Sequence, residues 1–555
     1  MRLRASLSRR PDMFAFLLYA VAALACTWPL ARELYTHLPL GSLNSATVPL
    51  FNVWTLEWNA HSLQHGYRGY WDAPIFYPTR GAFALSESQA LTGLGFAALR
   101  PWFGSVAGYN LVLLANLVLN AFGARRALRV LGVSPFCATL SGLLALALPF
   151  VWKELGVLQL TAFWPLWFAL AELALLSRAQ PEDAAPPTAA GPRLALCCAA
   201  TLWTCSYYAL FLAVFLLLWA AMFVRRELFA PPVQRLALLG AALLLLIAAA
   251  PLALNQPRLM RGYARSAETI HDGSATARSY LRVPLGALVG ELLPPLQGVI
   301  GRRSLSPGSV VAALALLGAW SVRRDRRRRK FWIWCGASLA LALVLSFGSR
   351  WWVGSIKPYE LIVERYWPGF AHVRTPYRFA AFVQLFVLLF AGLGLQALWH
   401  MLARFGARRH MLLTAAALLG VLEVVPLGAR LTRFPSEAMR APWVAWLAQH
   451  PGGAVAMLPP SASGKSSDYE QTVVAMLQAL RHGHPLLNGY SGFFPASNDQ
   501  LMFALRRFPD PRRQRLLSHL PLHYAVIDNA WLGTRDPAPL QRVFDGGTQS
   551  VYRRP

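Results

Sequence analysis

The stretch RRDRRRRK, Arg323 to Lys330, lies between two apolar stretches at 307–321 and 331–348. A strongly basic loop between two hydrophobic stretches is typical of the cytoplasmic side of a membrane protein, where it contacts anionic lipid head groups. The formal net charge of +28 would otherwise raise the question of nucleic acid. Because the densest run of basic residues lies between two apolar stretches, we expect membrane lipid as a partner and no nucleic acid.

Basic residues alternate between the two sides of the apolar stretches along the whole chain. There are eleven such stretches: 13–30, 108–124, 136–152, 160–177, 194–206, 208–224, 236–253, 307–321, 331–348, 377–399 and 411–427. The segments predicted to lie inside (1–12, 124–133, 178–193, 225–235, 322–330 and 400–410) hold 22 Lys and Arg in 69 positions. The outside segments (31–107, 153–159, 254–306 and 349–376) hold 16 in 165. This asymmetry predicts an α-helical polytopic membrane protein with about 11 transmembrane helices, the N-terminus in the cytoplasm and the C-terminus outside.

Composition agrees with a membrane protein, since hydrophobic residues make up 56% of the 555 positions. All six cysteines fall inside apolar stretches and are interpreted as small core residues. The N-terminal MRLRASLSRR resembles the start of a signal peptide. The apolar run behind it is long and has no convincing cleavage site, so an uncleaved first helix is expected.

The first outer loop, 31–107, is too polar to span a membrane. Within it Trp54, Trp58 and His61 stand at helical spacing on one face, with Glu57 beside them, which predicts an amphipathic helix in the membrane interface. A Pro- and aromatic-rich stretch, WDAPIFYP, begins at Trp71, and a second short amphipathic run is expected from about residue 87 to 99.

The same loop holds several of the chain's rare carboxylates. Only 25 residues are Asp or Glu, and Glu57, Asp72 and Glu87 stand among aromatic side chains. A partly desolvated carboxylate binds a proton more readily, as a general base must, so these three are the catalytic candidates. The alternative is that they cap helices or pair with Arg68 and Arg80.

Arg374 and Arg378 flank the outer end of the 377–399 stretch and are candidates for binding a lipid phosphate or diphosphate, which guanidinium groups hold bidentately. The alternative is that they anchor the helix at the head groups. Glu423, in the last apolar stretch, is either functional or close enough to the surface for its charge to reach water. The sequence contains no Walker A, GxSxG, HExxH or CxxC motif and indicates no metal site.

The domain boundaries follow from a change in pattern. Residues 1–427 form the predicted membrane domain, and 428–555 are predicted to fold as an extracytoplasmic α/β domain. Short apolar runs at 454–458, 523–527 and 550–552 alternate there with helical patterns at 469–480, 499–507 and 512–519. This alternation between Pro and Gly turns predicts an α/β domain.

Several motifs occur in a recognisable order. They are FNVWTLEWNAHSLQHG (51–66), WDAPIFYPTRGAFALSE (71–87), GYN (108–110), LSFGSR (345–350), PGFAHVRTPYRFA (368–380), PGGAVAMLP (451–459), NGYSGFFP (488–495) and FPDP (508–511). With them the chain resembles bacterial multi-spanning glycosyltransferase-like proteins related to the GT-C superfamily. The resemblance implies a polyprenyl-phosphate-linked sugar as donor, an acid of the first outer loop as catalyst, and an outer C-terminal domain that helps to select the acceptor. It also implies a bacterial inner membrane as the location. No cofactor is expected, and a divalent metal is left open.

Two positions depart from that pattern. Members of the group tend to have an Asp four residues before the asparagine that matches Asn52, where this chain has Val48. They also tend to have a histidine where it has Val157. A catalytically inactive GT-C-like scaffold that binds a lipid intermediate is therefore the main alternative to a transferase. A transporter is disfavoured because no internal repeat is found.

Overall fold

The computed structural model describes residues 2–177, 188–224, 232–282, 286–287, 304–426, 428–461, 465–506 and 522–554. The chain divides into two compact units. The helical unit comprises Met1–Arg32, Leu113–Pro251 and Gly262–Arg430. The loop–tail unit comprises Glu33–Val112, Leu252–Arg261 and Leu431–Pro555, so the first outer loop clusters with the tail.

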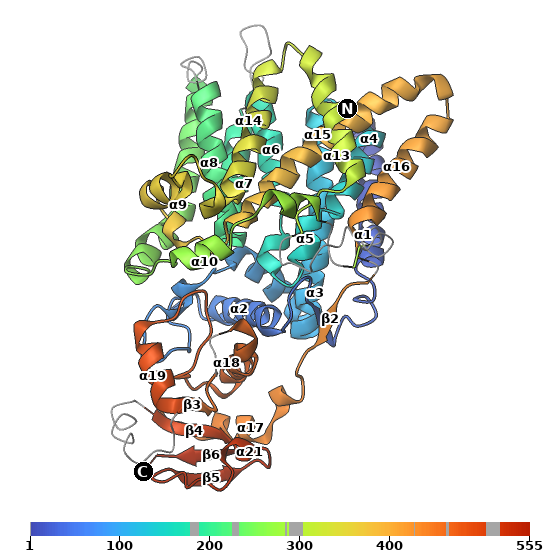
Figure 1. Cartoon of the computed structure of the whole chain (residues 1–555). Helices are drawn as coiled ribbons and strands as arrows, with labels where there is room; N and C mark the ends of the chain where they lie inside the picture. Colours follow the sequence, from blue (N-terminus) through green and yellow to red (C-terminus); the bar gives the residue numbers. More distant parts are fainter. Residues whose placement is uncertain are drawn as a thin grey trace. The chain divides into compact units, whose positions relative to one another are not determined.

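Every predicted apolar stretch coincides with helical structure. The helices are α1 (Arg2–Cys26), α3 (Ala90–Val130), α4 (Pro135–Leu146), α5 (Pro149–Lys153), α6 (Trp164–Leu176), α7 (Ala190–Thr204), α8 (Ser206–Phe223), α9 (Pro232–Leu259), α10 (Ala267–Asp272), α13 (Ser309–Ser321), α14 (Arg329–Ser346), α15 (Ala380–Met401) and α16 (Arg408–Val424), as Figure 1 shows. Within the described residues, seven helices are long and apolar enough to cross a membrane. The chain is a multi-pass membrane protein. The number eleven stays a prediction, because α13 and α16 have only 13 and 17 residues.

Helices α13 and α15 approach each other through glycine. A Cβ atom at Gly318 would lie 1.9 Å from the carbonyl oxygen of Phe390, and one at Gly394 would lie 1.9 Å from that of Leu314. Small residues let helices pack backbone to backbone in lipid, where dispersion replaces the hydrophobic effect as the attraction between them. Most of α15 is buried, which makes it a central element of the helical unit.

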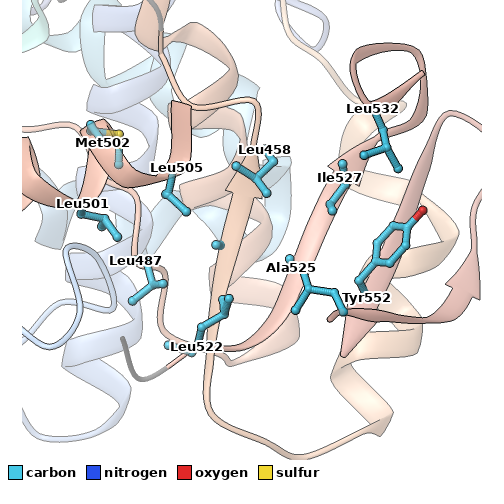
Figure 2. Packing of buried hydrophobic residues seen from close by; sticks show 13 residues of the cluster. Leu458, Leu487, Leu501, Met502, Leu505, Leu522, Ala525, Ile527, Leu532 and Tyr552 are labelled. Carbon is cyan, nitrogen blue, oxygen red and sulfur yellow. The ribbon is translucent and has the colours of Figure 1, made fainter. Parts of the chain in front are cut away.

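The tail folds as the predicted α/β domain. Strands β3 (Ala454–Leu458), β4 (Leu522–Asp528), β6 (Gln549–Arg553) and β5 (Gln541–Asp545) form one sheet in that order, with β3 and β4 parallel and the other pairs antiparallel. Its helices are α17 (Pro442–Gln449), α18 (Glu470–His482), α19 (Ala496–Arg506) and α21 (Asn529–Leu532). Leu458, Ile527 and Leu505 belong to the core in Figure 2. The expected helix at 512–519 and the FPDP motif lie outside the described residues.

Two segments that carry the family resemblance pair with each other inside the loop–tail unit. Phe76 donates its N–H to the carbonyl of Asn488 at 3.3 Å, and Phe493 donates to that of Leu85 at 3.0 Å. Just before the second motif, Leu486 accepts from the Tyr77 N–H at 2.9 Å. The buried side chain of Asn488 then bonds both backbone groups of Met457 in β3, at 2.7 and 3.1 Å. A second contact between loop and tail is the antiparallel pair β1 (His37–Pro39) and β2 (Leu431–Arg433).

Helix α2 (Thr47–Gln64) lies at the predicted position but is not amphipathic. Thirteen of its eighteen residues are buried, among them polar Asn52 and Asn59. Its aromatic side chains pack against Phe83 of the same loop, and α18 packs against the helix as well. The prediction that only one face of this helix is apolar and covered was wrong, because protein covers most of its circumference. Its place in the membrane interface stays a prediction.

The glycine approach between α13 and α15 yields a direct stability test. We expect Gly318→Ala to lower the free energy of unfolding by about 1–3 kcal/mol, because the added methyl group overlaps the Phe390 carbonyl. Gly336→Ala in α14 is the matched control, since a Cβ there meets nothing within 4 Å. Thermal unfolding of the purified protein in detergent measures both, and equal midpoints would contradict the close packing.

Candidate functional site

Glu57 lies on α2, where its carboxylate is already held by two donors. The Arg100 Nε lies 3.0 Å from Oε1 and 2.8 Å from Oε2, and the Ser105 hydroxyl also donates to Oε1. Both partners belong to α3, on either side of a break at Gly104, whose φ of 75° suits only glycine. The Glu57 side chain is 12% exposed and that of Arg100 is 41% exposed. The arrangement fixes a charged carboxylate and orients one guanidinium group.

A cavity of about 120 Å³ opens beside this pair, entirely within the loop–tail unit. Its lining residues are Val53, Glu57, His61, Gln64, Arg100, Ser105, Phe434, Met439, Leu477, Leu480 and Arg481. Burial lowers the pKa of His61, and the charges of His65 and Arg100 lower it further. The imidazole is therefore mainly neutral at pH 7 in the empty cavity.

The other two candidate acids occupy different surroundings in the same unit. Asp72 is exposed and accepts a hydrogen bond from the Gly81 N–H at 2.7 Å, which closes the turn between them. Glu87 is only 9% exposed. The residues after it are tied to α2: the Ser88 carbonyl accepts from Asn59 at 2.7 Å and Gln89 donates to Asn52 at 2.9 Å. The structure thus brings none of the three acids together.

The tail supplies a carboxylate near the position where the family pattern has its Asp. Glu470, the first residue of α18, accepts a hydrogen bond from the Ala46 N–H at 3.1 Å, two residues before Val48. Thr47 donates its hydroxyl to the Ser466 carbonyl at 2.7 Å. The side chain of Ala46, at the N-terminus of α2, cannot accept a hydrogen bond. Residues of the tail therefore supply the capping contacts of this helix. Sequence reasoning missed Glu470 because 422 positions separate it from Val48 along the chain.

A buried ionic cluster in the helical unit was also missed. The Lys153 ammonium contacts the Glu154 carboxylate and donates to the Tyr377 hydroxyl at 3.1 Å, while that hydroxyl donates to Glu154 at 2.6 Å. Lys153 and Glu154 are each 5% exposed. Burial opposes ionisation of Glu154, but the charges of Lys153 and Arg378 lower its pKa below the ordinary value. The available signal was a lysine, one of only four in the chain, at the end of an apolar stretch.

The two arginines proposed for phosphate binding differ in their surroundings. The Arg378 guanidinium lies 4.5 Å from the centre of the Tyr207 ring. Among the described residues, Arg378 and Lys153 are the two cations whose charges act on Glu154. Arg374 has an exposed side chain, and its carbonyl abuts Gly273, where a Cβ would lie 2.2 Å away.

Glu423 has a capping role in the structure. Its Oε1 accepts from the Ser309 N–H at 2.5 Å and its Oε2 from the Val310 N–H at 3.0 Å. Both donors open α13, so the carboxylate satisfies otherwise unpaired amides and complements the helix dipole. Among the described residues, no three His, Cys, Asp or Glu side chains cluster as metal ligands.

Comparison with known proteins identifies the fold. No family model matches the chain, and no curated protein matches its sequence. The structure of arabinofuranosyltransferase AftD from Mycobacteria matches 98% of this chain, with a TM-score of 0.58 and 14% identity. The chain spans 40% of AftD. The structure of ArnT from Cupriavidus metallidurans, solved with bound undecaprenyl phosphate, is less similar. The match covers 97% of both chains at 14% identity, with a TM-score of 0.47.

The chain therefore shares its fold with AftD, in agreement with the predicted α-helical multi-spanning architecture. At 14% identity it shows the fold alone.

The buried cluster around Lys153 predicts an uneven response to mutation. Lys153→Met leaves the buried Glu154 without its cation and should cost about 3–5 kcal/mol of stability. The double change Lys153→Met with Glu154→Gln removes both charges and should cost clearly less. Thermal unfolding in detergent compares them, and a double variant no more stable than the single one would show that the pair is not coupled.

Proposed function

We propose that the protein is a membrane glycosyltransferase that moves a sugar from a polyprenyl-phosphate-linked donor to an extracytoplasmic acceptor. The observation that carries the proposal is the fold shared with AftD, an arabinofuranosyltransferase, over 98% of the chain. The motif segments 71–87 and 488–495 support it, because they pair directly through backbone hydrogen bonds.

The proposed reaction inverts the anomeric centre. A carboxylate takes the proton of the acceptor hydroxyl, whose oxygen bonds to the anomeric carbon while the bond to the lipid phosphate breaks. The departing phosphate carries away the bonding electron pair, and Arg374 and Arg378 are proposed to neutralise it. Lys153 is a further positively charged group in this part of the helical unit, since it lies near Glu154 as Arg378 does.

Glu87 is our preferred base among the three acids. It is buried, whereas Glu57 already holds Arg100 and Ser105, and Asp72 is exposed and holds the 72–81 turn. Desolvation by burial favours the protonated form of a carboxylate. Glu57 then serves to orient Arg100, and Asp72 to shape the loop.

The second candidate function is a scaffold that binds a lipid-linked intermediate without catalysis. Val48 favours it, because valine cannot accept a proton where the family pattern has an acid. The structural roles of Glu57 and Asp72 favour it as well. The two functions differ in whether neutralising Glu87 stops turnover.

Membranes incubated with radiolabelled polyprenyl-phosphate sugars should release lipid phosphate when the wild-type chain is present. We expect Glu87→Gln to lower this rate by at least 10²-fold, as loss of a general base does. Asp499→Asn, an exposed acid on α19, is the matched control. Glu470→Gln tests the carboxylate beside Val48. Release unchanged by a Glu57→Gln, Asp72→Asn and Glu87→Gln triple change would reject these acids as the catalyst.

The proposed bacterial inner-membrane topology places the loop and the tail outside and the basic loops in the cytoplasm. In a cysteine-free background, we expect a membrane-impermeant maleimide to label His65→Cys and Gln500→Cys in spheroplasts. Arg404→Cys should be labelled only after lysis. All three positions are exposed, so access to solvent does not decide the result. Labelling of positions 65 and 500 from opposite sides would overturn the topology.

A further inference from the structure

The cavity beside Glu57 presents polar groups that the protein itself does not use. Within the described part of the chain, the ring nitrogens of His61 and the amide of Gln64 form no hydrogen bond. Both contacts of Arg100 with Glu57 run through its Nε, so that pair leaves the terminal nitrogens of the guanidinium available. Arg481 uses one terminal nitrogen, which donates to the Met439 carbonyl at 2.9 Å.

The charge of the cavity is positive. Arg100 and Arg481 face one carboxylate, Glu57, which leaves a net charge of one while His61 is neutral. Glu57 offsets one of the two positive charges through its ion pair with Arg100, so the net preference for an anion comes from the second guanidinium group, Arg481. Two guanidinium groups with unused nitrogens are suited to a planar carboxylate or a phosphate.

The rest of the wall is apolar and comes from α2, α18 and the segment between β2 and α17. Val53, Leu477 and Leu480 contribute aliphatic surface opposite the charged groups. At about 120 Å³ the space is smaller than the roughly 300–1,000 Å³ of a site for a drug-sized ligand. It therefore fits one charged group of a larger molecule and part of the ring that bears it.

We propose that this cavity binds the oxyanion group, carboxylate or phosphate, of an acidic saccharide. The two arginines hold the anion, His61 and Gln64 donate hydrogen bonds to it, and the aliphatic wall packs against the sugar ring. The inference deepens the proposed function by naming an acidic saccharide as the class of acceptor. The role of the saccharide as acceptor rests on the proposed function. Its binding in the cavity does not, since binding can be measured without transfer.

His61 gives the site a second, independent signature. In the empty cavity its pKa is lowered by burial, His65 and Arg100. A bound anion favours the imidazolium form, so the pKa rises on binding and His61 takes up a proton near pH 7. The charged and titratable groups that face it are Glu57, Arg100, Arg481 and His65. Binding of the anion is therefore coupled to proton uptake.

Calorimetric titration of the purified full-length protein in detergent tests both features. The probes are D-glucuronate, D-glucose 6-phosphate, D-glucose and short-chain phosphatidic acid, each in two buffers with different heats of ionisation. We expect both acidic sugars to bind with net proton uptake and glucose to bind at least tenfold more weakly. Arg481→Gln should weaken the acidic sugars about tenfold, since a hydrogen bond to a charged group is worth about 1.5–3 kcal/mol. Arg440→Gln, an exposed arginine outside the cavity lining, is the matched control.

His61→Gln should abolish the proton uptake while the sugars still bind. Equal binding of glucose, no binding of either acidic sugar, or an unchanged affinity in Arg481→Gln would each overturn the site. Tighter binding of phosphatidic acid than of both sugars would assign the cavity to a lipid head group and overturn its saccharide role. Glucuronate binding by a protein without transferase activity would reject the proposed function and leave the site standing.

Discussion

The rest of the structure depends on one constraint, which is that the helices lie in bilayer hydrocarbon rather than in water. In hydrocarbon every backbone amide needs a partner within the protein, so the apolar stretches become helices and the charges collect in the segments between them. Helices in lipid gain little from hiding apolar surface and must approach closely instead. The meeting of α13 and α15 at Gly318 and Gly394 is the local result. The Glu423 carboxylate is tolerated in the helical unit because it accepts hydrogen bonds from two backbone amides of α13.

The polar chemistry is divided between the two units. The helical unit keeps Lys153, Glu154 and Tyr377 in a closed arrangement, with the positively charged Arg378 nearby. The loop–tail unit keeps Glu57 and Arg100 beside an open cavity. Lipid phosphate and acceptor are the two anionic or polyhydroxyl partners that a transferase of this class must hold. Our proposals assign one to each unit on the basis of its own residues.

The sequence predicted the elements well and their partners poorly. Apolar length and basic loops are local properties, so all eleven stretches and the strands at 454–458 and 523–527 could be located. Periodicity also located α2, but it could not reveal that α18 packs against α2. The same limit hid the Glu57 contact with Arg100, the capping of α2 by Glu470, and Tyr377 beside Lys153. Each joins residues far apart in the chain, which no local pattern records.

The bond between Ala46 and Glu470, with the pairing of Tyr77 and Leu486, has a consequence for how the protein is made. The ribosome produces the first loop hundreds of residues before the segments that complete it. During that interval α2 lacks its cap and its main packing surface. The loop–tail unit can therefore reach its final form only after the last helix has been synthesised, and a chain that terminates early leaves a loop open to chaperones and proteases.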